Sequence, residues 1–299
     1  MNDVLPKNIR QSIEQIELDK TSGSIELAKK SAKILIDLVK KTDSLGQIKN
    51  TAHSLLEAQP AMASIFNLVN NLMLYIDKNK KQQLKNILFT YCKKFQQNLE
   101  ISDKLINKQA IKLIKNNVTI ITHSYSSTVL STFLYAKKLK RKFSVICTES
   151  RPINEGIILA KKLGKNGIKV KLIVDSAVFS FISDADIIFI GGDAITNTGL
   201  INKIGTKGIA ITAQNYNIPI YALCSIIKLV PQNYKIKLDI EKNPNEIINN
   251  KITNVTPINY YFDLTPLEFI TGIVTEKQIL KPQEIEEKIK NLKIHNSLA

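Results

Sequence analysis

The fold is decided by the stretch Ile187-Ile188-Phe189-Ile190-Gly191-Gly192-Asp193-Ala194, followed by Asn202-Lys203-Ile204-Gly205-Thr206. A short, continuous apolar run is typical of a strand buried on both faces, which is the habit of parallel sheets. The glycine pair permits a sharp turn and the close approach of a ligand. Asp193 is therefore expected at the carboxyl end of a buried strand, where open α/β sheets bind ligands. If Asp193 and Lys203 flank such a crevice, they could bind a phosphorylated polyol. The alternative is a purely structural role in stabilising the loop.

Strand-like and helix-like segments alternate along the second part of the chain. This alternation predicts βαβ units, and right-handed crossovers make a doubly wound, Rossmann-like parallel sheet. The tail adds one strand and a final amphipathic helix. The expected strands cover 118–122, 143–148, 170–175, 185–190, 218–223 and 260–264, and the expected helices cover 126–140, 155–165, 207–216 and 282–292.

The first part of the chain has a helical pattern from residue 7 to about 105. Apolar residues recur at helical spacing, Ser24 is a candidate N-cap, and Gln59-Pro60 interrupts the pattern. A lysine-rich helix is expected over 82–112. The sequence thus predicts an α/β protein with a helical domain, 1–110, and a Rossmann-like domain with a C-terminal strand and helix, 111–299.

Composition narrows the class of protein. The 299 residues are 44% hydrophobic, which suits a globular core, and no apolar run approaches the ~20 residues of a membrane span. The segment from Met1 to Pro6 lacks the pattern of a secretory signal. The cysteines Cys92, Cys147 and Cys224 are too widely spaced for a disulfide framework or a zinc site. We expect a cytoplasmic protein without a metal or cofactor.

The net charge of +16 has two interpretations. The chain is rich in Lys, Ile and Asn, which is typical of an AT-biased genome and would give a solvated basic surface without a function. A basic face could instead meet an acidic protein, RNA or phosphate ligands. The sequence contains no recognised motif for specific RNA readout.

Polar clusters follow four of the expected strands and should share one edge of the sheet. Hydroxyls, helix N-termini and an arginine that converge there would make a phosphate site, whereas capping of the helices would use the same side chains. No dinucleotide-binding or P-loop motif is present, so the chain does not resemble an NTPase. The candidate ligand-binding residues are Thr122, His123, Ser124, Ser126, Arg151, Asp193, Asn202 and Lys203.

These motifs resemble those of the translation initiation factor 2B alpha/beta/delta family, whose superfamily includes ribose-1,5-bisphosphate isomerase and methylthioribose-1-phosphate isomerase. The resemblance covers most of the chain, with its blocks in the family order. The matching blocks are residues 58–63, 122–126, 148–152, 174–178, 191–195, 202–206 and 262–266.

The resemblance implies a helical domain packed on a Rossmann-like domain, with dimers formed through the latter. It also implies one of two functions. The isomerases convert a phosphorylated aldose to a ketose with a cysteine and an aspartate. The initiation-factor subunits form the regulatory core of a guanine nucleotide exchange factor in protein biosynthesis, and they bind initiation factor 2, a GTPase.

The family positions can be compared with this sequence one at a time. The isomerase aspartate corresponds to Asp193, whereas the cysteine corresponds to Ser124, whose hydroxyl is far less acidic than a thiol. Two arginine positions correspond to Ser22 and Gln59, and a glutamine corresponds to Glu155, which would repel a phosphate. The loop after Asp193 is also one residue short.

These differences favour a non-catalytic regulatory subunit that binds a translation GTPase, paralogous subunits or a sugar or nucleotide phosphate. We expect a homodimer or higher oligomer, no membrane and no specific nucleic-acid binding. The alternative is a sugar-phosphate isomerase, an intramolecular oxidoreductase in which Asp193 is catalytic and Ser124 stands at the cysteine position.

Overall fold

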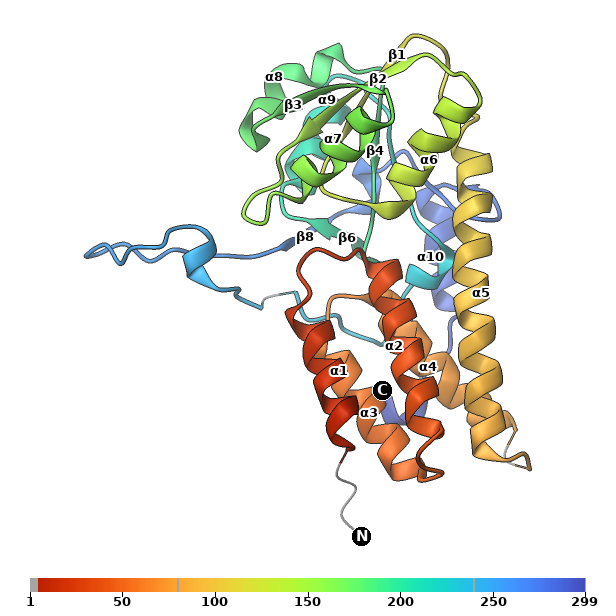
Figure 1. Cartoon of the computed structure of the whole chain (residues 1–299). Helices are drawn as coiled ribbons and strands as arrows, with labels where there is room; N and C mark the ends of the chain where they lie inside the picture. Colours follow the sequence, from red (N-terminus) through yellow and green to blue (C-terminus); the bar gives the residue numbers. More distant parts are fainter. Residues whose placement is uncertain (1–4, 80, 239, 299) are drawn as a thin grey trace.

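The computed structural model describes residues 5–79, 81–238 and 240–298. The first four residues, which belong to the segment used above to argue against a secretory signal, lie outside the described ranges. A helical bundle occupies one end of the molecule, a mostly parallel sheet with flanking helices occupies the other, and a long arm projects from between them (Figure 1). The expected α/β class and the order of a helical part followed by a Rossmann-like part are confirmed.

The helical bundle forms because each helix has an apolar stripe that is buried against its neighbours. Buried side chains from all of its helices make one continuous core. The last helix is the longest, and its C-terminal turns leave the bundle and pack under the sheet through Ile106 and Ala110. The helices are α1 (Lys7–Leu18), α2 (Ser24–Val39), α3 (Leu45–Ala58), α4 (Ala63–Lys78) and α5 (Leu84–Ala110).

The central sheet has seven strands in the order β10-β9-β7-β4-β1-β2-β3, and all are parallel to their neighbours except β10. The expected strands and helices appear with ends shifted by no more than a few residues; β9 and β10 were not predicted. The strands are β1 (Val118–Thr122), β2 (Phe143–Thr148), β3 (Lys169–Ile173), β4 (Ile187–Ile190), β7 (Ile220–Leu223), β9 (Gly272–Val274) and β10 (Ile279–Leu280).

Helices cover both faces of the sheet, which is why its central strands are apolar throughout. Alternate residues of one strand enter different cores: Ile187 and Phe189 face the α6 and α7 side, whereas Ile188 and Ile190 face the α9 and α10 side. The covering elements are α6 (Ser127–Lys138), α7 (Glu155–Lys165), η1 (Asp175–Ala177), α8 (Val178–Phe181), η2 (Ile182–Asp184), α9 (Thr206–Asn215) and α10 (Pro282–Lys290).

A second, antiparallel sheet lies between the bundle and the central sheet. It consists of β5 (Ala194–Thr196), β6 (Gly199–Lys203) and β8 (Phe262–Thr265), in the order β5-β6-β8. The sequence predicted a polar loop between Asp193 and Asn202; the structure instead has a β-hairpin there. The strand expected at 260–264 pairs with this hairpin and not with the central sheet.

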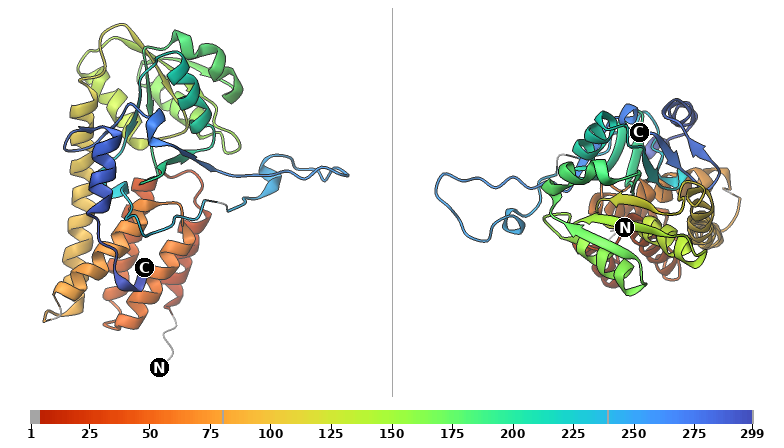
Figure 2. Two further views of the ribbon diagram at one scale, coloured as in Figure 1. Left: turned by 180° about the vertical axis from the view of Figure 1, so that it is seen from behind. Right: turned by 90° about the horizontal axis from the view of Figure 1, so that it is seen from above.

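Residues 240–261 form an arm that leaves the body of the protein and returns to it (Figures 1 and 2). Among its described residues, the only helical turn is η4 (Pro244–Glu246), and none belongs to a strand. Four aliphatic side chains beyond this turn are exposed: Ile247, Ile252, Val255 and Ile258. The sequence did not predict this arm, because its apolar residues do not recur at the spacing of a helix or a strand.

The last residues of the chain return to the helical bundle. The Asn70 amide in α4 donates to the carbonyl of Lys293 (2.9 Å) and accepts from the backbone N–H of His295 (2.8 Å). The division into domains 1–110 and 111–299 therefore stays a prediction, since the C-terminal segment belongs to the bundle in space. No helix within the described ranges is long and apolar enough to cross a membrane.

Candidate functional site

A small hollow lies where the helical bundle meets the carboxyl ends of β1, β2 and β4. Its volume is about 70 Å³. The α1–α2 connection closes it from the bundle side, and the base of the arm closes it from another. The lining side chains that matter for chemistry are Lys20, Ser24, Ser124, Glu155, Asp193, Lys203 and Tyr261.

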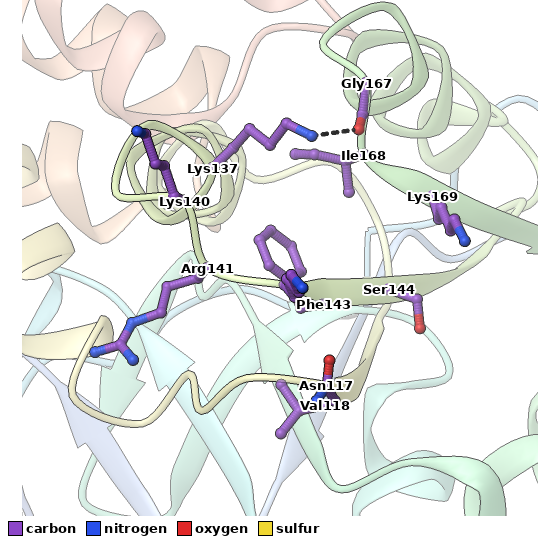
Figure 3. Close-up of a pocket in the computed structure, with 11 residues that line it drawn as sticks. Asn117, Val118, Lys137, Lys140, Arg141, Phe143, Ser144, Gly167, Ile168 and Lys169 are labelled. Atoms are coloured by element: carbon purple, nitrogen blue, oxygen red, sulfur yellow. Dashed lines mark hydrogen bonds between the residues drawn. The ribbon is translucent and has the colours of Figure 1, made fainter.

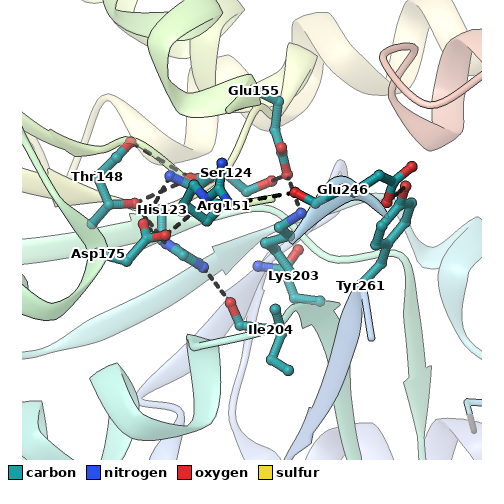
Figure 4. A network of polar contacts seen from close by, with 12 residues as sticks. His123, Ser124, Thr148, Arg151, Glu155, Asp175, Lys203, Ile204, Glu246 and Tyr261 are labelled. Carbon is teal, nitrogen blue, oxygen red and sulfur yellow. Dashed lines mark hydrogen bonds and ion pairs between the residues drawn. The ribbon is translucent and has the colours of Figure 1, made fainter. Parts of the chain in front are cut away.

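A buried ion pair is the centre of this site (Figure 4). Glu155, the first residue of α7, places Oε1 3.0 Å from the Lys203 ammonium at the end of β6. The Ser124 hydroxyl donates to the same oxygen at 3.0 Å. The side chains of Glu155 and Lys203 are 11% and 5% exposed, so the lysine charge is neutralised inside the protein. The Lys203 ammonium also lies 5.0 Å from the centre of the Tyr261 ring.

The second oxygen of Glu155 is buried without a partner. Oε2 makes no hydrogen bond to any described residue, although buried carboxylate oxygens are normally satisfied. Glu155 lines the hollow, and its free acceptor suits a ligand that donates a hydrogen bond. A phosphate, which at neutral pH mainly accepts hydrogen bonds, would meet repulsion there.

Ser124 has an unusual backbone. Its φ is 69°, in the left-handed region that non-glycine residues rarely adopt, and its N–H donates to the Ser150 hydroxyl at 2.8 Å. This turn directs the Ser124 side chain back toward Glu155. Such conformations persist where surrounding bonds enforce them, and they cluster at functional sites.

Asp193 follows β4 after the glycine pair, as the sequence predicts, and it is partly buried. Burial raises the pKa of this carboxyl, whereas a hydrogen bond from Ser24 and the charges of Lys228 and Lys203 oppose the increase. The Lys228 ammonium is buried and donates to the carbonyl of Gly192. Ser24 was expected to cap α2; this expectation was wrong, because Gly23 is the N-cap and the Ser24 side chain binds Asp193.

His123 is a structural hydrogen-bonding residue beneath the site. Nε2 donates to the carbonyl of Ile204 (2.8 Å), so Nδ1 of the neutral ring accepts from the Thr148 hydroxyl (2.6 Å). The ring is 3% exposed, and this burial lowers its pKa despite the nearby carboxylates. The imidazole thus links β1, β2 and the connection after β6.

We expect stability to fall as the pH falls below the ordinary histidine value of about 6.5. Because burial lowers the pKa of His123 in the folded state, the unfolded chain takes up the proton first. This difference costs up to about 1.4 kcal/mol of unfolding free energy per pH unit below that value. Urea denaturation at pH 7.5, 6.5 and 5.5 should show this decline. His123→Gln should flatten the decline, and His53→Gln, at an exposed position, should not.

Three other predicted residues are not among those that line the hollow. Ser126 caps α6 by accepting from the N–H of Val129 (3.3 Å), and the Asn202 amide donates to the Thr206 hydroxyl (3.0 Å). Thr122 is buried at the end of β1. Their part in ligand binding stays a proposal, and helix capping accounts for the contact of Ser126.

Arg151 lies next to the site but is directed elsewhere. Its backbone N–H and that of Ser150 both donate to Asp175 (2.7 Å each), and its guanidinium donates to the carbonyls of Glu246 and Ile247 in the arm (3.3 and 3.4 Å). It is not among the residues that line the hollow. The structure therefore does not bring Arg151 and Lys203 together as two free cations.

Glu246 joins the base of the arm to the body. It accepts from Lys20 at 2.6 Å, from Asn259 at 2.8 Å and from the Tyr261 hydroxyl. These bonds hold its pKa below the ordinary value although burial acts in the opposite direction. Lys20 and Glu246 are 226 positions apart, so no sequence signal could have paired them.

The described residues contain no group of three or more His, Cys, Asp or Glu side chains that could hold a metal ion. The three cysteines are free and buried. None of them lines the hollow: at the position where the resemblance requires a thiol, the described site has only the Ser124 hydroxyl.

A family profile described as "Initiation factor 2 subunit family" matches residues 20–282. The chain belongs to this family. It is 30% identical to a protein of Archaeoglobus fulgidus named ribose 1,5-bisphosphate isomerase, over 93% of this chain and 91% of the relative. The family therefore includes both branches that the sequence suggested.

Two solved structures share this fold. The Pyrococcus horikoshii translation initiation factor eIF-2B is 31% identical and superposes with a TM-score of 0.83, over 93% of this chain and 98% of that one. A subunit of the tetrameric eIF2B-beta2-delta2 complex of C. thermophilum superposes with a TM-score of 0.74 at 19% identity, over 93% and 92% of the two chains. The second likeness concerns the fold alone.

Proposed function

We propose that this family member is a non-catalytic regulatory subunit of the initiation-factor type. The observation that carries the proposal is the buried pair of Glu155 and Lys203, in which the lysine that would hold a phosphate is already neutralised. The Ser124 hydroxyl occupies the position of the isomerase thiol and donates to the same carboxylate. The hollow of about 70 Å³ is also several-fold smaller than the ~300 Å³ or more of a typical ligand pocket.

The isomerase alternative has one observation in its favour. The raised pKa of Asp193 brings this carboxyl closer to the range in which a general acid or base operates. Moving a proton between adjacent carbons needs one group that removes it and a group that returns it. Neither the buried Glu155 pair nor Ser124 supplies an evident second group, and the burial of Asp193 is equally consistent with its structural bond to Ser24.

Turnover of sugar phosphates separates the two functions. We expect the protein to convert neither ribose 1,5-bisphosphate nor methylthioribose 1-phosphate above background, measured as ketose product. Ser124→Cys alone should not create activity, because it leaves the carboxylate of Glu155 on Lys203. Turnover of either compound at ~1 per second, an ordinary enzymatic rate, would exclude the regulatory function. Asp193→Asn would then test whether that turnover is the chain's own.

A regulatory subunit acts through other chains, and we propose a symmetric dimer formed through the Rossmann-like half. Two-fold association is the commonest form of oligomer. The four exposed aliphatic side chains of the arm favour burial in a contact of this kind. Light scattering at micromolar concentration should give twice the mass of the chain, and a monomer would contradict the proposal. A paralogous subunit or a translation GTPase would be a further partner.

A further inference from the structure

A second hollow, of about 640 Å³, lies at the edge of the sheet opposite the candidate site (Figure 3). It is formed by the amino ends of β1, β2 and β3 and by the connections that enter these strands. Five cationic side chains line it, and no acidic side chain does. These cations are Lys137, Lys140, Arg141, Lys142 and Lys169.

The cations are exposed and available. Toward the described residues, these five side chains make a single hydrogen bond, from the Lys137 ammonium to the carbonyl of Gly167 (2.8 Å). Four further exposed cations come from the same connections and from the helix ends beside them: Lys112, Lys115, Lys138 and Lys165. We call these nine residues the basic edge. Two carboxylates, Asp184 and Asp186, precede β4 at the same end of the sheet, and Asp186 accepts from the N–H of Thr119.

The local structure does not require such a charge. Cations in the last turn of a helix stabilise its C-terminus, which accounts for Lys137, Lys138 and Lys165. It does not account for Lys140, Arg141 and Lys142, which lie beyond the end of α6, or for Lys169 at the start of β3. A composition bias would raise the number of lysines over the whole surface. It would not explain why acidic side chains are absent from the lining of this one hollow.

We propose that the basic edge binds the phosphate backbone of RNA without sequence readout. Interfaces with nucleic acid are much more positively charged than interfaces between proteins, which are depleted in lysine. The hollow also presents the hydrogen-bonding side chains of Asn117 and Ser144 and the half-buried ring of Phe143. Hydroxyl and amide donors commonly contact phosphate and sugar alongside the cations. The edge is separated by the length of the strands from the candidate site, so both could be occupied together.

The test is the salt dependence of RNA affinity. The probe is a fluorescein-labelled uridine oligonucleotide of about 24 residues, and its anisotropy is titrated with full-length protein between 50 and 300 mM KCl. The variant combines Lys140→Asn, Arg141→Gln, Lys142→Gln and Lys169→Gln; asparagine is chosen at position 140 because φ there is 60°. The matched control removes four exposed lysines from the α4–α5 end of the bundle: Lys78, Lys81, Lys85 and Lys93, each to Gln.

We expect the wild type and the control to bind RNA with similar affinities and salt slopes. The variant should lose about ten-fold or more in affinity at 100 mM KCl, and its slope should be shallower by about 2 to 3, since each phosphate contact on a single strand contributes about 0.7. Absence of RNA binding at 50 mM KCl, or equal losses in variant and control, would overturn the proposal. It would also be overturned if polyglutamate of equal charge bound the same four residues more tightly than RNA, because the edge would then suit an acidic protein.

Discussion

Glu155→Gln is expected to lower the unfolding free energy by about 3 kcal/mol in phosphate-free buffer. The substitution leaves Lys203 charged and buried, with Asp193 as its remaining carboxylate neighbour, and removing one partner of a buried pair is costly. Glutamine keeps the size of the side chain and an oxygen for the Ser124 hydroxyl, so the loss reports mainly the missing charge. Urea denaturation measures it.

The same variant should gain a response to phosphate. Once the carboxylate is removed, the Lys203 ammonium can bind an anion, and a ligand that binds only the folded state stabilises it. Sodium phosphate should therefore raise the thermal midpoint of the variant more than that of the wild type, with sodium chloride at equal ionic strength as the reference. Glu149→Gln, at the end of β2 and outside the pair, is the matched control. An equal response in wild type and variant would show that Glu155 does not exclude anions.

Gly156→Ala is expected to destabilise the protein by about 3 kcal/mol, at the upper end of the usual range for overpacking. A Cβ at this position would lie 1.9 Å from the carbonyl oxygen of Thr148 and 2.8 Å from the Ser150 hydroxyl. Helix α7 would have to move away from β2, and Glu155 would move with it. The loss should appear in the urea midpoint.

Gly164→Ala in the same helix provides the control. A Cβ at Gly164 meets nothing within 4 Å, so alanine should stabilise the helix by about 0.5 to 1 kcal/mol. Opposite signs for the two substitutions would show that close contact with β2, and not helix propensity, sets the requirement for glycine at position 156. Equal effects would contradict this explanation.

The βαβ core was predictable because each of its elements has a local signal. The strands β1 and β2 and the helix α7 have the expected bounds, since buried strands are continuous apolar runs and helices repeat at 3.6 residues. The sequence did not predict the hairpin of β5 and β6. Its three-residue first strand is too short for a period, and its polar residues resemble a loop.

The candidate site was predictable only in part. Ser124 and Asp193 come together because the carboxyl ends of β1 and β4 meet at one edge of the parallel sheet. Lys203 joins them from β6 of the antiparallel sheet, which the sequence did not predict. Lys228, whose charge acts on Asp193, and the Lys20–Glu246 pair beside the hollow come from segments that are distant in the sequence. The prediction for Ser24 failed for the same reason. A serine near the start of a helix is expected to bond to the backbone of that helix, whereas the Ser24 side chain bonds to Asp193, which comes from the other half of the chain.

The contacts at the base of the arm make the arm and the hollow thermodynamically linked. Lys20 lines the hollow and pairs with Glu246, while Tyr261 both lines the hollow and donates to Glu246. If a molecule that binds the arm and a ligand that binds the hollow both alter these bonds, each changes the affinity of the protein for the other by the same factor. Through the arm, binding in a site of about 70 Å³ is coupled to a surface that lies outside the residues lining that site.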